Sequence, residues 1–92
     1  MPKRKFNEWG QYQTNWEAKA RNALLGKKVV GVRYLSKAEM AESFSDWYSV
    51  PIAIFFDDGT WIIPQRDDEG NDGGALACSS DKCPTIPVFY VK

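Results

Sequence analysis

The chain has 92 residues and a formal net charge of zero, and it contains no histidine. This length predicts a single domain, and the 43% hydrophobic and 14% aromatic content supplies enough apolar side chains for one core. Histidine is the commonest general base and a favoured metal ligand, so its absence argues against catalysis. We therefore expect a protein that is not an enzyme and that carries no cofactor.

Charge is distributed unevenly along the chain. Residues 1–33 hold eight basic residues against two acids, whereas residues 34–92 hold four basic residues against ten acids. This asymmetry indicates either a charged recognition surface or mutual neutralisation of the two segments within the fold. No apolar run of eighteen residues and no signal-type segment is present, which predicts a soluble, cytoplasmic protein without a membrane partner.

Residues 1–25 are predicted to form a basic, aromatic-rich helical extension that precedes a compact core over residues 26–92. Thr14 and Glu17 have the T-x-x-E spacing of a capping box, which predicts a helix start at Thr14. Gly26 suits the left-handed C-terminal cap of this helix. Whether the helix extends back over residues 6–13 is left open. The apolar stripe of this helix consists of Trp16, Ala20, Ala23 and Leu24.

The core is predicted to contain strands over residues 29–35, 50–56 and 85–91, because these runs are rich in β-branched and aromatic residues. The middle run is almost continuously apolar, which predicts a central strand with both faces covered. Between the first two strands, Ser36 and Glu39 form a second capping-box pattern that predicts a short helix.

Asp58-Gly59 predicts a two-residue type I′ turn, since both residue types tolerate positive φ. With that turn Phe56 would face Trp61, and the following residues would form a further strand. The elements together predict an α+β fold with a mainly antiparallel sheet of about four strands and the N-terminal amphipathic helix on one face. A small SH3-like β-barrel with an N-terminal helix is the alternative.

The segment from Asp67 to Leu76 combines four acids with three glycines. Its spacing does not fit the calcium loop of an EF-hand, but a divalent-cation site remains an alternative. Asn71 or Asp72 is suited to cap a short helix over residues 73–77. The paired glycines suit a close approach of backbone to another element or to a partner.

Trp47 and Tyr48 precede the central strand and are either a buried corner or a surface anchor of the kind enriched in binding hot spots. Combined with the acidic segment, they form the candidate surface for a protein partner. Its residues are Trp47, Tyr48, Asp67, Asp68, Glu69, Asn71 and Asp72.

Basic side chains interleaved with Trp9, Tyr12 and Trp16 indicate an alternative function in nucleic-acid binding, in which cations contact phosphates and aromatic rings stack on bases. The zero net charge argues against this alternative. The candidate residues are Lys3, Arg4, Lys5, Lys19, Arg21, Lys27 and Lys28.

Two cysteines, Cys78 and Cys83, are spaced as C-x4-C. They are candidates for a small-loop disulfide, for half of a zinc site, or for ordinary reduced thiols. Zinc would need two further ligands, and the chain offers no histidine and no other cysteine. Reduced thiols are the favoured interpretation, and no metal site is predicted.

Several motifs resemble a group of small uncharacterised proteins of bacteria and of phages, especially phages of cyanobacteria. The motifs are GKKVVGVRYL at residues 26–35, the Trp47-Tyr48 pair with Pro51, DDGT at 57–60, Pro64, DDEGNDGGAL at 67–76 and TIPV at 85–88. No activity is established for that group, so the resemblance implies a setting and no mechanism. In a phage, a small charge-polarised protein of this kind would modulate a host or phage protein by binding it.

Overall fold

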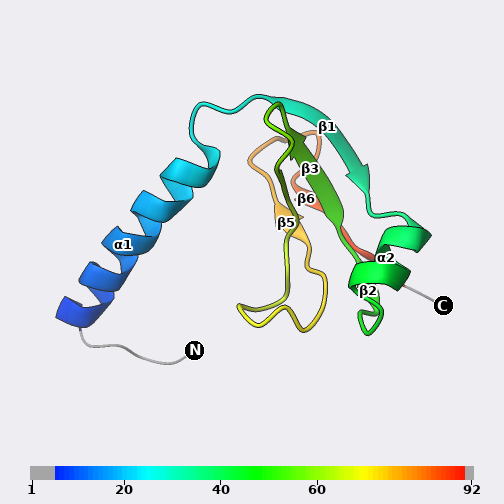
Figure 1. Ribbon diagram of the computed structural model, residues 1–92, viewed down its shortest axis with the longest axis horizontal. Coiled ribbons are helices and arrows are strands. Elements are labelled where there is room, and N and C mark those ends of the chain that lie inside the picture. The colour runs from blue at the N-terminus through cyan, green and yellow to red at the C-terminus, as the bar shows by residue number, and fades with distance from the viewer. Residues whose placement is uncertain (1–5, 91–92) are drawn as a thin grey trace.

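The computed structural model describes residues 6–90, with side chains from Gly10 onward, and it shows an α+β fold (Figure 1). The α+β class is therefore confirmed. Instead of one sheet of about four strands, the described residues form three small antiparallel sheets, which do not close into a barrel. The elements are α1 (Phe6–Leu24), β1 (Val29–Tyr34), α2 (Lys37–Ser43), β2 (Ser49–Val50), β3 (Ile52–Phe56), β4 (Trp61–Ile62), β5 (Leu76–Ala77), β6 (Thr85–Ile86) and β7 (Phe89–Tyr90).

The largest sheet has the strand order β1-β3-β4, so the predicted central strand is confirmed. Pro51 is fully buried and separates β3 from β2, which pairs with β7, while β5 pairs with β6. Pro87 likewise divides the predicted last strand into β6 and β7. Both prolines lack the N–H that a continuous ladder needs, and this divides the sheet. The buried apolar core consists of Met40, Trp47, Ile52, Ala53 and Phe56.

Helix α2 begins at the predicted capping box. The Ser36 hydroxyl accepts from the Glu39 N–H at 3.2 Å, and the Glu39 carboxylate accepts from the Ser36 N–H at 2.8 Å. The Glu39 carboxylate also accepts hydrogen bonds from the two terminal guanidinium nitrogens of Arg33, at 2.8 and 3.0 Å. These contacts join α2 to β1 and bring Met40 into the core.

Helix α1 is continuous from Phe6, so the predicted start at Thr14 is wrong and the open segment 6–13 is helical. A capping box has a function only where backbone N–H groups lack partners, and residues inside a helix already bond to carbonyls one turn earlier. Glu17 instead accepts a side-chain bond from Gln13 and pairs with Arg21. The predicted cap at Gly26 is confirmed by its φ of 81°.

Helix α1 stands beside the rest of the fold and does not cover the sheet (Figure 1), contrary to the expectation from its apolar stripe. Trp16 on this stripe is 52% exposed. The radius of gyration is 15.3 Å, compared with about 12 Å for a compact chain of this length. The end of the helix is held at the hairpin turn, where Lys27 Nζ lies 2.7 Å from Asp58 Oδ2.

The β3-β4 hairpin has a three-residue loop rather than the predicted two-residue turn. Gly59 has a φ of 89°, but Asp58 does not have positive φ, which a type I′ turn requires. The Asp58 carboxylate accepts from the N–H and hydroxyl of Thr60, and the extra loop residue shifts the register by one. Trp61 therefore pairs with Phe55 rather than Phe56, on the face of the sheet that bears α2.

Candidate functional site: an acidic loop fastened to an aromatic corner

The acidic loop, residues 67–72, is closed at its base by backbone pairing. The N–H of Arg66 donates to the Asp72 carbonyl at 2.9 Å, and the N–H of Gly74 donates to the Pro64 carbonyl at 3.0 Å. Gly70 turns the chain with a φ of 73°. The loop is thus a compact structure with its own hydrogen bonds and not an open tether.

Gly73 and Gly74 are sites of close backbone approach, as the sequence predicted. A Cβ atom on Gly73 would lie 2.5 Å from the Ser49 carbonyl oxygen, and one on Gly74 would lie 3.0 Å from the Gln65 carbonyl oxygen. The predicted helix over residues 73–77 is wrong, because Gly73 pairs with Gln65 and the chain then enters β5. Glycine residues also disfavour a helix, and here the backbone is extended and pairs with Gln65 instead.

Asp67 organises the interior of the loop. Its carboxylate accepts from the Asn71 amide at 2.9 Å and from the backbone N–H groups of Asn71 and Glu69 at 3.2 and 3.1 Å. These bonds to Asn71 and Glu69 hold the pKa of Asp67 below its usual value. Asp67 and Asn71 therefore shape the loop, and the Asn71 amide also donates to Glu69 Oε1 at 3.1 Å.

Asp72 fastens the loop to the chain before β3. Its Oδ1 atom accepts from the N–H groups of Tyr48 at 3.1 Å, Ser49 at 2.8 Å and Gly73 at 2.8 Å. Burial opposes ionisation of Asp72, but these backbone donors outweigh it and hold its pKa below the usual value. A single carboxylate oxygen thus joins two segments that lie 23 residues or more apart in sequence.

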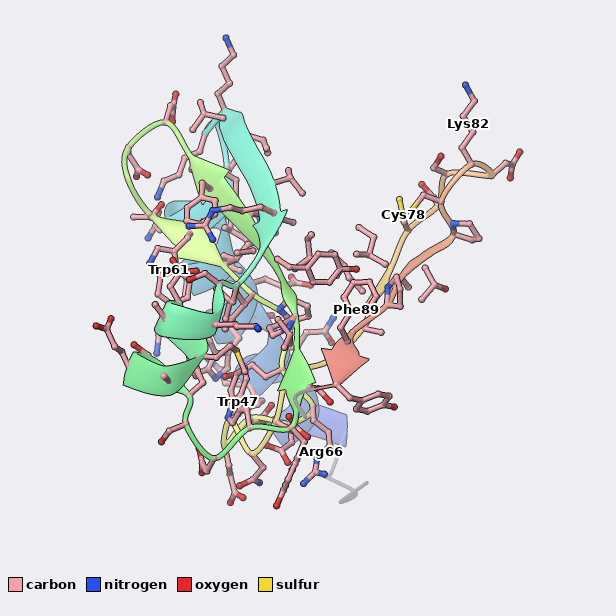
Figure 2. The ribbon with its side chains drawn as sticks, turned by 90° about the vertical axis from the view of Figure 1, so that its right-hand side faces the viewer. Trp47, Trp61, Arg66, Cys78, Lys82 and Phe89 are labelled. Atoms are coloured by element: carbon pink, nitrogen blue, oxygen red, sulfur yellow. The ribbon has the colours of Figure 1, made fainter. Side chains whose placement is uncertain are left out.

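Trp47 provides a second connection to the loop. Its side chain is only 5% exposed, and its indole Nε1 donates to the Gly70 carbonyl at 2.7 Å. Of the two interpretations of Trp47, the structure shows the buried corner, so this ring offers a partner almost no surface. Figure 2 shows Trp47 beneath α2, near the segment that carries Arg66.

Three of the candidate partner-binding residues are left pointing outward. Tyr48 is 73% exposed, and Asp68 and Glu69 are exposed, although the Glu69 carboxylate also accepts from the Asn71 amide at 3.1 Å. The Tyr48 backbone is held by Asp72, so its ring is carried on the same fastened unit as the two carboxylates. The acidic loop therefore meets the Tyr48 backbone, and the role of these residues in partner binding stays a prediction.

Among the described basic residues proposed for nucleic-acid binding, three side chains make contacts within the chain. Lys27 is bound to Asp58, and Arg21 lies 3.7 Å from Glu17. Lys19 lies over the Trp16 ring, 4.4 Å from its centroid. Lys28 is exposed near the hairpin turn. Lys3, Arg4 and Lys5 lie outside the described residues.

No three His, Cys, Asp or Glu side chains are grouped to hold a metal ion within residues 6–90. Cys78 and Cys83 are free and exposed, in agreement with the favoured interpretation as reduced thiols. Neither helix of the described chain is both long and apolar enough to traverse a lipid bilayer.

The sequence did not indicate two further exposed aromatic residues, Phe89 and Tyr90, on the strand that pairs with β2. Strand propensity was the only signal at these positions, and it does not distinguish a covered strand from an exposed one. Ser49 was missed as well, because the role of its N–H is visible only with Asp72 in place. No family model, curated protein or solved structure matches the chain.

Proposed function

We propose that the protein is a non-enzymatic interaction module that binds a basic segment of a partner protein through Tyr48, Asp68 and Glu69. The observation that carries the proposal is the attachment of the acidic loop to the Trp47–Ser49 segment by Asp72 and by the Trp47 indole. This attachment holds the backbone that carries the exposed Tyr48 ring beside the loop that carries Asp68 and Glu69, and the Glu69 carboxylate also accepts from the Asn71 amide at 3.1 Å.

A fixed surface binds more tightly than a mobile one of the same composition, because less conformational entropy is lost on association. Tyrosine is enriched among the residues that dominate binding energy, and 73% of the Tyr48 side chain is available to a partner. Carboxylates around such an anchor favour a basic partner and increase its association rate. In the phage setting that the motifs suggest, the partner would be a host or phage protein.

The test is a pull-down with the tagged protein, followed by affinity measurement with each protein that is retained. We expect Asp68→Lys or Glu69→Lys to weaken binding about tenfold each and Tyr48→Ala to weaken it further. The matched control is Asp81→Lys, which makes the same charge change at an exposed acid on the β5-β6 turn.

Asp67 and Asp72 are left intact in these variants, because both carboxylates hold the loop together. Retention of the same proteins at equal affinity by the wild type and the Tyr48, Asp68 and Glu69 variants would show that the surface is not used. An equal loss of affinity in the Asp81→Lys control would show that the effect arises from net charge alone and not from this surface.

A second candidate function is nucleic-acid binding by α1, since this helix stands apart and leaves Trp16 half exposed beside Lys19. It predicts an affinity for single-stranded nucleic acid that falls steeply with salt. A Trp16→Ala variant is expected to lose about 1–3 kcal/mol if a base stacks on this ring. A gel-shift titration at low salt that shows no binding excludes this function.

A further inference from the structure

A cavity of about 590 Å³ lies between α2 and the β2-β7 pair. Its volume lies within the range of about 300–1,000 Å³ that is typical of small-molecule sites. The wall is mainly apolar and aromatic. It includes Leu35, Met40, Phe44, Trp47, Val50 and Tyr90.

The wall has both a rigid side and an adaptable side. The rigid side is the Phe44 ring, which packs against the buried Trp47 ring with centroids 4.3 Å apart, and Trp47 is itself held by its bond to the Gly70 carbonyl. Met40 provides a flexible, polarisable side chain that adjusts to the shape of an apolar group. An apolar body is therefore expected to be held against a preformed aromatic surface.

The polar residues at the cavity indicate which head group the ligand would carry. Lys37 and Ser45 line it together with the Tyr90 ring. Within the described residues Lys37 takes part in no ion pair, and the neighbouring acid on α2, Glu39, is held by Arg33. An unpaired ammonium beside an apolar wall complements a ligand with one anionic head group.

We propose that this cavity binds a small amphipathic anion, in which an alkyl or aromatic body lies against Leu35, Phe44 and Val50 and a carboxylate-type head contacts Lys37. The site is separate from the partner surface on the acidic loop, and the proposal does not depend on that function. Ser45 and Tyr90, which also line the cavity, each carry a hydroxyl group.

The test is calorimetric titration of the full chain with decanoate, and with decylammonium as a probe of the same length and opposite charge. We expect one saturable decanoate site and at least tenfold weaker binding of decylammonium. Lys37→Gln should weaken decanoate binding about fivefold, as expected for the loss of one partly exposed ion pair. Lys82→Gln is the matched control, because Lys82 lies on the β5-β6 turn, far from Trp47 in Figure 2.

A second variant, Ala41→Phe, places a large side chain at the cavity wall and should reduce decanoate affinity at least tenfold. Both variants are first compared with the wild type by thermal unfolding, and Lys37→Gln decides the proposal if Ala41→Phe does not fold. Absence of a saturable site, equal affinity for the two probes, or an equal effect of Lys37→Gln and Lys82→Gln would overturn the proposal.

Discussion

Asp72 is predicted to be the residue on which the position of the acidic loop depends. All three of its bonds to backbone N–H groups end on one oxygen, Oδ1, whereas Oδ2 lies 3.5 Å from the Ser49 hydroxyl. The change Asp72→Asn can keep a carbonyl oxygen at the Oδ1 position, removes the charge and replaces Oδ2 by an NH2 donor near the Ser49 hydroxyl. The change Asp72→Ala removes the acceptor and leaves all three donors without it.

The expected magnitudes follow from the burial of these donors. Ser49 is 7% exposed and Gly73 is buried, so water does not easily replace their acceptor, whereas Tyr48 is exposed. Hydrogen bonds to a charged group contribute about 1.5–3 kcal/mol each. Two such bonds give a loss of about 3–6 kcal/mol for Asp72→Ala, and loss of the charge alone gives about 1 kcal/mol for Asp72→Asn.

The assay is urea unfolding followed by circular dichroism, with thermal unfolding as a second measure. For a domain of this size 1 kcal/mol corresponds to about 4–8 °C in Tm, so Asp72→Ala should unfold about 12 °C or more below the wild type. Asp68→Ala is the control, because its side chain is exposed. Equal losses for Asp72→Ala and Asp68→Ala would refute the fastening role, and equal losses for Asp72→Ala and Asp72→Asn would refute the backbone-acceptor argument.

Three further predictions concern stability. Gly73→Ala should destabilise the protein by about 1–3 kcal/mol in urea unfolding, because the new Cβ would lie 2.5 Å from the Ser49 carbonyl oxygen. Gly10→Ala should stabilise it by about 0.5–1 kcal/mol, since Gly10 lies within α1 and its Cβ would meet nothing within 4 Å; a loss in this variant would contradict the helical assignment. The bonds from Arg33 and Ser36 lower the pKa of Glu39 from 4.5 to about 2. Its contribution to stability is therefore fully present above pH 4.5 and is lost as the pH falls toward 2, so the decline in Tm over this range should be shallower in Arg33→Gln.

Local sequence patterns were sufficient to predict those elements that depend on neighbouring residues only. The Ser36 capping box, the Gly26 cap and the apolar run of β3 each depend on neighbouring residues, and each was predicted correctly. The hairpin was also predicted, but not its loop length. Asp58-Gly59 suits a two-residue and a three-residue loop alike, and the bonds from Asp58 to Thr60 accompany the longer one.

The acidic segment shows the limit of prediction for the candidate site. Its charge, its exposure and its need for glycines were visible in the sequence, as was the candidate aromatic residue Tyr48. The division of its acids into structural and available groups was not visible. That division depends on Asp72 meeting Ser49 and on Gly70 meeting Trp47, contacts that no local pattern encodes.

The sequence by itself determined the α+β class, the central strand, both helix-cap signals that the structure retains and the acidic character of the loop, because propensity and hydrophobic pattern act over a few residues. The tertiary structure decided the hairpin register, the separation of α1 from the sheet, the burial of Trp47 and the exposure of Tyr48. These features depend on which hydrogen-bond donors and apolar surfaces find partners far away in the chain. That choice is made only when the whole core is assembled.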